Sequence, residues 1–201
     1  MRNKPYSESC GQNRDAILNV IQPLLTHAGS VLEIGSGTGQ HAVYFSEMMP
    51  HLTWNTSDRI ENIEGIKLWL AEVDSEKLLQ PVVLDVAQQS WPEVAFDTVF
   101  TANTCHIMNQ RCVENMISKV GELLPDGGQL IIYGPFNYNQ KYTSTSNQQF
   151  DQWLKSRDSE SGIRNFEDLN ELAEKAGMRL VSDYEMPANN RLLHWQKQRG
   201  S

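Results

Sequence analysis

Long apolar runs are missing from this sequence, because no stretch approaches the roughly 18 consecutive apolar residues that a membrane-spanning helix needs. Residues 1–11 are polar and lack the apolar core of a signal peptide. We therefore expect a cytoplasmic protein that has no contact with a membrane.

Cysteine is scarce as well, with only Cys10, Cys105 and Cys112 in the chain. An odd count without regular spacing fits neither a disulfide framework nor a zinc site. We expect reduced thiols and no bound metal.

Positive charge is in deficit, since 17 Lys and Arg stand against 25 Asp and Glu, which gives a formal net charge of -8. Proteins that bind a nucleic-acid backbone usually carry a basic surface. The charge balance therefore argues against nucleic acid as a partner, although a local basic patch stays compatible with it.

The composition that is present fits one folded domain. Hydrophobic residues make up 39% and charged residues 21% of the 201 residues, which is close to ordinary globular usage. A chain of this length can bury a substantial core. We expect one domain over residues 1–201, with residues 1–12 as a flexible N-terminal segment.

Apolar spacing predicts alternating strands and helices over the first two thirds of the chain. Short apolar runs predict strands at residues 31–34, 52–56, 82–86, 98–102 and 129–133. Helical spacing predicts helices at residues 14–25, with Asn13 as the cap, and at 40–49, 63–73 and 112–124. This alternation predicts an α/β fold of the Rossmann-like class, in which helices cover both faces of a mainly parallel sheet.

The C-terminal third has a different pattern. A polar stretch at residues 136–147 predicts a long loop, and loops of this length are often functional. Helices are expected at residues 150–154 and 165–176, followed by strands at 178–184 and 191–196. Because no crossover helix separates the last two strands, we expect an antiparallel hairpin at the sheet edge.

The most informative motif follows the first predicted strand. Glu33 ends the apolar run, and Gly35, Gly37 and Gly39 then occupy alternate positions before a helix. Glycines at this place allow a sharp turn and a close approach of the backbone to a ligand. The dinucleotide fingerprint has its third glycine one residue later, where this chain has Gln40, so the spacing argues against a nicotinamide-dependent oxidoreductase.

Two acidic residues follow the next two predicted strands. Asp58 lies about 20 residues beyond the glycines, where an acid accepts hydrogen bonds from ribose hydroxyls. Asp85 could accept from an adenine amine, with the backbone amide of Val86 against the ring. Each aspartate also fits an ordinary turn or helix cap. The order of a glycine turn and two acids, each at the carboxyl end of a strand, favours a nucleoside-type cofactor.

These residues resemble the class I S-adenosylmethionine-dependent methyltransferases. The chain from about residue 12 to 197 further resembles the methyltransferase-like twenty-six family, a domain-of-unknown-function group with a methyltransferase fold. The matching stretches are LEIGSGTGQHAVYF, WNTSD, LDV, the AN..H segment, YGPF, SN..FD, GIRN and MPANN.

The resemblance implies a seven-stranded sheet whose last strand is antiparallel, and S-adenosylmethionine as cofactor with S-adenosylhomocysteine as product. It places the cofactor on the residues of these motifs: Glu33, Gly35, Ser36, Gly37, Gly39, His41, Asp58, Arg59, Asp85, Val86 and Asn103.

The chain differs from the family pattern in two places. Gln12 precedes Asn13 where the family has a basic residue, and Ile107, Met108 and Asn109 replace a segment that usually contains Ser and Pro. Both differences lie where the methyl acceptor is expected, so they bear on the acceptor more than on the cofactor.

Candidate catalytic residues follow from the chemistry of methyl transfer. The sulfonium is already activated, so alignment of the acceptor with the methyl group can supply much of the rate, and a general base is optional. His106 is the first candidate for that base; it also fits a role in packing or orienting the cofactor. Tyr133 either faces the acceptor or is a core aromatic residue with its hydroxyl at the rim.

Acceptor-binding residues are expected at Asn13, Asn189 and Asn190, although the last two also fit an ordinary hairpin turn. The leading hypothesis is a methyltransferase, a monomer or homodimer, that acts on an unidentified small molecule or protein group. The alternative is a protein that binds S-adenosylmethionine without catalysis and acts through a partner.

Overall fold

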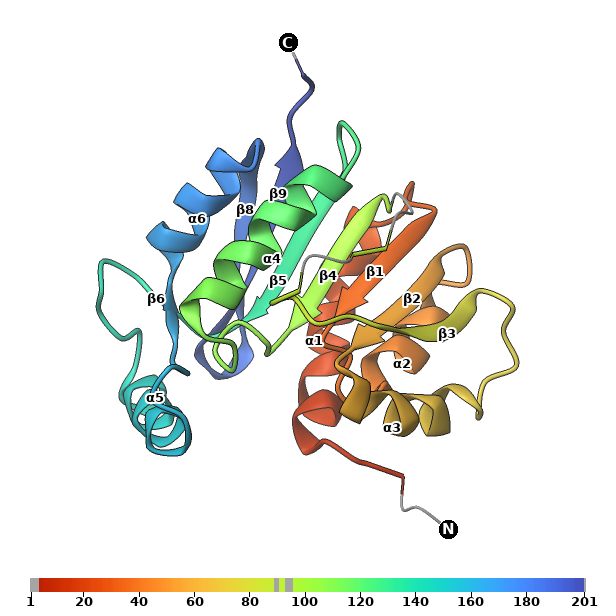
Figure 1. Ribbon diagram of the computed structural model, residues 1–201, viewed down its shortest axis with the longest axis horizontal. Helices are drawn as coiled ribbons and strands as arrows, with labels where there is room; N and C mark the ends of the chain where they lie inside the picture. Colours follow the sequence, from red (N-terminus) through yellow and green to blue (C-terminus); the bar gives the residue numbers. More distant parts are fainter. Residues whose placement is uncertain (1–3, 89–90, 93–95, 201) are drawn as a thin grey trace.

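Seven strands form one sheet with helices on both faces (Figure 1). The computed structural model describes residues 4–88, 91–92 and 96–200. The sheet has the order β3-β2-β1-β4-β5-β9-β8. Its strands are β1 (Ser30–Ile34), β2 (Thr53–Asp58), β3 (Leu78–Val83), β4 (Thr98–Ala102), β5 (Gln129–Gly134), β8 (Met178–Met186) and β9 (Asn190–Lys197).

The strand directions match the expected fold. Strands β1 to β5 pair in parallel, whereas β9 pairs antiparallel with both β5 and β8. The expected hairpin exists, but β9 is inserted between β5 and the edge strand β8. Because β9 runs against β5, its first residues lie beside the end of β5, where Tyr133 is opposite Leu192. The prediction of a seven-stranded, mainly parallel sheet with an antiparallel last strand is confirmed.

Six helices longer than one turn are present in the described part of the chain. They are α1 (Glu8–Leu24), α2 (Gln40–Met48), α3 (Ile60–Leu70), α4 (Gln110–Leu123), α5 (Thr145–Arg157) and α6 (Phe166–Lys175). A short second sheet pairs β6 (Phe136–Asn137) with β7 (Arg164–Asn165), and one 3₁₀ turn, η1 (Pro187–Asn189), joins β8 to β9. No helix in residues 4–88, 91–92 and 96–200 combines the length and the hydropathy needed to cross a bilayer.

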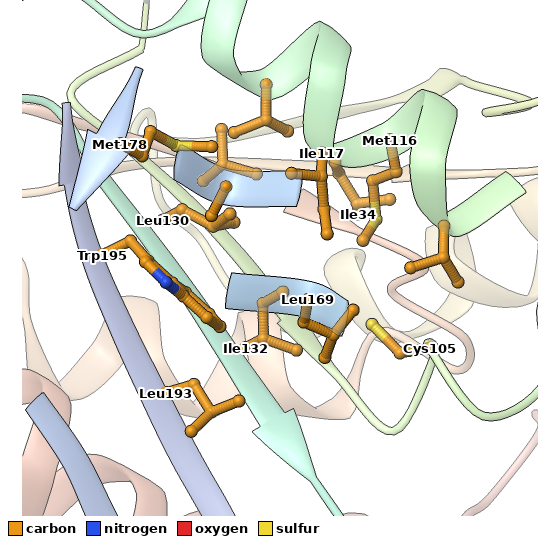
Figure 2. Packing of buried hydrophobic residues seen from close by; sticks show 14 of the residues in the cluster. Ile34, Cys105, Met116, Ile117, Leu130, Ile132, Leu169, Met178, Leu193 and Trp195 are labelled. Carbon is orange, nitrogen blue, oxygen red and sulfur yellow. The ribbon is translucent and has the colours of Figure 1, made fainter. Parts of the chain in front are cut away.

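Alternation along the strands sends side chains into two cores. On β5, Leu130 and Ile132 belong to the core under α4 and α6, and Figure 2 shows them with Ile117 and Leu169. Ile131 belongs to the opposite core, which α1 and α2 cover. Both faces of the sheet are therefore buried, as expected for a parallel sheet.

The N-terminal helix is longer than its apolar spacing indicates. It begins at Glu8 after the N-cap Ser7, so residues 8–12 are helical and Asn13 lies inside the helix rather than capping it. The preceding residues are tied to the domain, because the Ser7 amide donates to Gln40 Oε1 at 2.6 Å and Trp69 Nε1 donates to the Pro5 carbonyl at 2.6 Å. These are long-range contacts, which a local pattern does not contain.

Two other boundaries differ from expectation. The third strand lies at Leu78–Val83 and not at residues 82–86. It is an edge strand with Leu79 and Val83 exposed, so its apolar run does not mark its register. The fifth helix is longer than residues 150–154 because Ser144 caps it, accepting a hydrogen bond from the Asn147 amide at 3.1 Å.

Candidate functional site

A cleft of about 1560 Å³ opens at the carboxyl ends of the parallel strands. Its walls come from the loops after β1 to β5, from α1 and α5, and from η1. Figure 1 shows α5 and the first turns of α1 at this same end of the sheet. Ligands of open α/β sheets bind at this position.

Fourteen of the sixteen residues that the sequence nominates line this cleft. They are Asn13, Gly35, Ser36, Gly37, His41, Asp58, Arg59, Asp85, Val86, Asn103, His106, Tyr133, Asn189 and Asn190. Glu33 and Gly39 do not: Glu33 lies beneath the glycine loop, and Gly39 precedes α2, where a Cβ would be 3.3 Å from Ile66.

The glycine loop presents its backbone to the cleft. Gly37 has a φ of +59°, a left-handed conformation that favours glycine, and a Cβ there would meet nothing within 4 Å. Gly35 has a φ of +70°, and a Cβ there would collide with Thr104 in the loop after β4. The loop therefore has open space on its cleft side and close packing beneath.

Asp58 at the end of β2 combines both of the roles that the sequence left open. Its Oδ2 accepts from the Gly37 amide at 2.7 Å, and its Oδ1 accepts from the Arg59 amide at 2.7 Å and Asn62 Nδ2 at 2.8 Å. A carboxylate has about four acceptor positions. One position is left for a ligand hydroxyl, while the others hold the glycine turn and the start of α3.

Glu33 supports the loop from below. It is 2% exposed, and its Oε2 accepts from Trp54 Nε1 at 3.0 Å and from Ser36 Oγ at 3.1 Å. Burial raises the pKa of Glu33 to about 7, the hydrogen bonds from Trp54 and Ser36 oppose the increase, and the charge of Asp58 adds to it. Its carboxyl group therefore acts on the loop and not directly on the cleft.

Asp85 lies in the loop after β3, between Leu84 and Val86, and all three line the cleft. Asp85 Oδ1 accepts from the Ala87 amide at 3.0 Å, and Oδ2 accepts from Gln88 Nε2 at 3.4 Å. Leu84 and Val86 are buried. The arrangement offers two apolar side chains and a carboxylate, which suits a planar base with an exocyclic amine.

The far end of the cleft brings together four polar side chains from distant segments. Asn13 Oδ1 lies 2.7 Å from His41 Nε2, and an amide oxygen can only accept, so His41 carries its proton on Nε2. Burial, with the charge of Arg14, lowers the pKa of His41 to about 4. Burial raises the pKa of Tyr133, and hydrogen bonds from Asn13 and Asn190 oppose that increase.

His106 follows β4 and is 6% exposed. Its ring meets Phe150 edge-on, with centroids 5.2 Å apart. Burial, followed by the charge of Arg164, lowers the pKa of His106 to about 4. Within the described residues the His106 ring has no hydrogen-bond partner, so a neutral imidazole with a free nitrogen lines the cleft.

Asn103 follows β4 directly and has a left-handed conformation, with a φ of +60°. Its amide donates to the Tyr133 carbonyl at 2.9 Å, which fixes the chain between the two strand ends. Asparagine tolerates this conformation better than most residues. Asn103 is therefore held in the cleft wall, with its Oδ1 near Gly134.

The sequence reasoning missed the contribution of α5 to the cleft. Phe150, Trp153, Leu154 and Arg157 of this helix line it. Trp153 is 48% exposed. One feature of the sequence could have indicated this role. Phe150 and Trp153 are aromatic residues at i, i+3 spacing in a polar segment, which places both on one helix face.

Asn189, the last residue of η1, connects to α5, and Asn190 begins β9. Ala188 and Asn189 both have a φ of +57°. Asn189 accepts from Asn147 Nδ2 through its backbone oxygen at 3.1 Å, and its Nδ2 donates to Ser146 Oγ at 3.3 Å. The Asn189 side chain is thus engaged by α5, whereas Asn190 faces Tyr133.

The three cysteines are free thiols. Across the stretches 4–88, 91–92 and 96–200, no three His, Cys, Asp or Glu side chains are arranged to hold a metal ion.

Solved methyltransferase structures share this fold. The chain matches apo SibL, an S-adenosylmethionine-dependent methyltransferase, at a TM-score of 0.79 with 20% identity, over 95% of this chain and 56% of that one. It matches human N-acetylserotonin methyltransferase, solved with S-adenosylmethionine, at 0.80 with 16% identity over 96% and 53%. It matches an O-methyltransferase family 2 protein from Planctomyces limnophilus in complex with apigenin at 0.80 with 16% identity over 94% and 60%.

At these identities the matches establish the Rossmann-like methyltransferase fold, and the chain spans between 53% and 60% of the length of those three structures. A family model covers nearly the whole chain, since it matches residues 4–197. The chain therefore belongs to the family described as protein of unknown function (DUF938).

Proposed function

We propose that this protein is an S-adenosylmethionine-dependent methyltransferase that acts on a small-molecule acceptor or a protein group. The observation that carries the proposal is the convergence of the glycine loop, Asp58, Asp85 and Asn103 on one cleft. Each lies at the carboxyl end of a different strand, or just beyond it, in a sheet whose fold solved methyltransferases share.

The cleft residues fit the cofactor. Gly37 leaves open space beside its backbone, Asp58 has an acceptor position free for a ribose hydroxyl, and Asp85 lies beside Leu84 and Val86 for an adenine. Glu33 contributes through Ser36 and Trp54 by holding the loop. When bound, S-adenosylmethionine supplies an activated methyl group on a sulfonium, and transfer leaves neutral S-adenosylhomocysteine.

His106 would accept the proton that the acceptor releases. Burial keeps the pKa of His106 near 4, so the ring is neutral at pH 7 and has an acceptor nitrogen. A proton held on His106 would place a positive charge in the cleft, replacing that of the sulfonium, which methyl transfer would remove. The net charge around the buried His106 ring would thereby stay constant, which limits the electrostatic cost of the proton transfer.

Contacts among the motifs support the finer resemblance to the methyltransferase-like twenty-six family. Asp151 of the SN..FD stretch accepts from the Ile163 amide of GIRN at 2.7 Å. Asn147 of the same stretch binds Asn189 of MPANN. Arg164 of GIRN donates from Nε to the Cys105 carbonyl, next to His106, at 3.0 Å. Separate motifs therefore meet around the end of the cleft that holds His106 and Tyr133. We call this the acceptor end.

A small molecule is the favoured acceptor. Two of the solved methyltransferases that share the fold are linked to small molecules: one is N-acetylserotonin methyltransferase, and the other is in complex with apigenin. The alternative is cofactor binding without catalysis. It is supported by Ile107, Met108 and Asn109, which differ from the family pattern and line the cleft beside His106.

Calorimetry and a labelling screen test the proposal. The protein is titrated with S-adenosylmethionine, S-adenosylhomocysteine and NAD, and then incubated with methyl-labelled S-adenosylmethionine and fractionated cell metabolites and extracts. We expect both adenosyl compounds to bind, NAD not to bind, and label to enter one fraction. Binding without label transfer would select the non-catalytic alternative, and tight NAD binding alone would overturn both.

A further inference from the structure

The acceptor end of the cleft has an aromatic surface with no assigned role in cofactor binding or proton transfer. Phe150 and Trp153 stack with centroids 5.8 Å apart and an angle of 17° between their planes. His106 meets the edge of Phe150 at 5.2 Å. All three line the cleft, and so do Ile107 and Leu154. One wall beside the candidate base is therefore aromatic and apolar.

This aromatic surface is costly to leave in water. Trp153 is 48% exposed and Ile107 is 61% exposed. Large apolar side chains that gather in a concave site mark a ligand-binding surface more often than scattered exposed ones do. A planar ring can pack against the exposed parts of these side chains, and aromatic contacts favour it over a saturated ring.

The cleft is lined by the acidic residues Asp58, Glu61, Glu64, Asp85 and Asp158, and its two basic side chains lie at opposite ends. Among the described residues that line it, the basic side chains are Arg59 and Arg157. Arg59 lies at the cofactor end and pairs with Glu61 at 2.5 Å. Arg157 lies at the acceptor end, with its guanidinium 4.3 Å from the centre of the Trp153 ring, and no described carboxylate lies within 4.0 Å of it.

The neighbouring acid does not neutralise Arg157. Asp158 also lines the cleft, but in the described part of the chain no ion pair within 4.0 Å joins its carboxylate to the Arg157 guanidinium; its Oδ1 accepts from the Glu160 amide at 3.0 Å. Lys155, one turn back on α5, is held by Asp151 at 2.6 Å. A guanidinium stacked on an aromatic ring is already oriented to bind a carboxylate with its free edge.

We propose that the acceptor is a small planar aromatic acid, whose ring packs on Phe150 and Trp153 and whose anionic group binds Arg157. His106, which contacts Phe150, then lies close to the bound ring. This inference names the substrate class of the proposed methyltransferase and rests on that function.

The test measures binding and does not require turnover. A panel of benzoates, hydroxybenzoates and indole carboxylates is titrated by calorimetry, with and without saturating S-adenosylhomocysteine. Each acid is compared with its carboxamide, which keeps the ring but removes the charge, and with the cyclohexane carboxylate, which keeps the charge but removes the planar ring. We expect both changes to weaken binding about tenfold, since stacking and a charged hydrogen bond are each worth about one tenfold step.

Variants locate the site. Trp153→Ala should weaken binding of the aromatic acids about tenfold. Trp153→Phe should retain most of the affinity of the unmodified protein. Arg157→Gln should remove the preference for acid over carboxamide, and Arg157→Lys should keep part of it. Arg179→Gln is the matched control, because Arg179 is an exposed arginine at the start of β8, outside the cleft. Unchanged affinity of every variant for S-adenosylhomocysteine shows that the fold is intact.

The outcomes separate this inference from the proposed function. If S-adenosylhomocysteine binds and no aromatic acid does, or if acids and carboxamides bind equally, the inference is overturned and the methyltransferase proposal stands. Equal binding of the cyclohexane carboxylates overturns it as well. If aromatic acids bind at Trp153 and Arg157 while S-adenosylhomocysteine does not bind, the subsite is supported and the methyltransferase proposal fails.

Discussion

Asn147 donates a hydrogen bond from Nδ2 to the backbone oxygen of Asn189 at 3.1 Å, across 42 residues of sequence. The bond ties the first turn of α5 to η1, where Ala188 and Asn189 are held in left-handed conformations. It thereby sets the position from which Asn190 reaches Tyr133. The acceptor end of the cleft is thus built by contacts between C-terminal segments, whereas the cofactor end is built by strand ends of the sheet.

Asn147→Ala tests this link. The change removes the bonds to Asn189 and to Thr143 Oγ1, and it leaves the Asn189 oxygen without its side-chain partner. We expect the free energy of unfolding to fall by about 1–3 kcal/mol, measured by urea denaturation. Gln148→Ala, at the exposed next position, is the control and should have little effect. Equal stability of the two variants would show that the bond contributes nothing.

Asp58→Ala should weaken S-adenosylmethionine binding by more than tenfold. The substitution removes the acceptor for a ribose hydroxyl and also releases the Gly37 amide, and an unpaired buried group costs about 1–3 kcal/mol. Calorimetry gives the affinity, with Asp74→Asn, an exposed aspartate outside the cleft, as the control. Unchanged affinity for Asp58→Ala would remove Asp58 from the cofactor site.

The cofactor end of the site was predictable because its residues are fixed by local patterns. Asp58 ends a strand and Gly35 and Gly37 follow one, and parallel strands bring their carboxyl ends to a common edge. Glu33 shows the limit of this reasoning. Alternation along β1 turns its side chain toward Trp54 and away from the cleft, and only the packed structure shows which face of the strand meets the ligand.

The acceptor end was less predictable because it depends on long-range contacts. Helix α5 carries Phe150 and Trp153 into the cleft wall. Two long-range hydrogen bonds hold this helix in place, one from Asn147 to Asn189 and one from the Ile163 amide to Asp151. Neither contact has a local signature. The register of β3 was missed for a related reason, since an exposed edge strand carries no clear apolar alternation.

Glu33→Gln should change how stability depends on pH. Burial raises the pKa of Glu33 in the folded protein to about 7, above its ordinary value, so the folded state holds this proton more tightly than the unfolded chain does. The contribution of Glu33 to the free energy of unfolding is therefore largest at low pH and falls as pH rises through its ordinary range to about 7. The loss is on the order of 3 kcal/mol at about 1.36 kcal/mol for each pKa unit.

Urea denaturation at several pH values between about 4.5 and 7.5 checks this prediction. The stability of Glu33→Gln relative to the unmodified protein should increase across that range. His41, His106 and His194, whose pKa values burial lowers to about 4, act in the opposite direction in both proteins and cancel in the difference. A difference that does not vary with pH would mean that Glu33 ionises normally.

His106→Gln should separate catalysis from cofactor binding. The amide keeps a polar side chain beside Phe150 but cannot take up a proton, so we expect turnover to fall by about 10²–10⁴ with the acceptor that the labelling screen identifies. Affinity for S-adenosylhomocysteine should stay within about twofold, because no proton moves in binding. Since the pKa of His106 lies near 4, kcat of the unmodified protein should hold between pH 6 and 8 and decline only toward pH 4, where the imidazolium can no longer accept. A fall in turnover of less than about tenfold for His106→Gln would mean that His106 orients the site and does not act as the base.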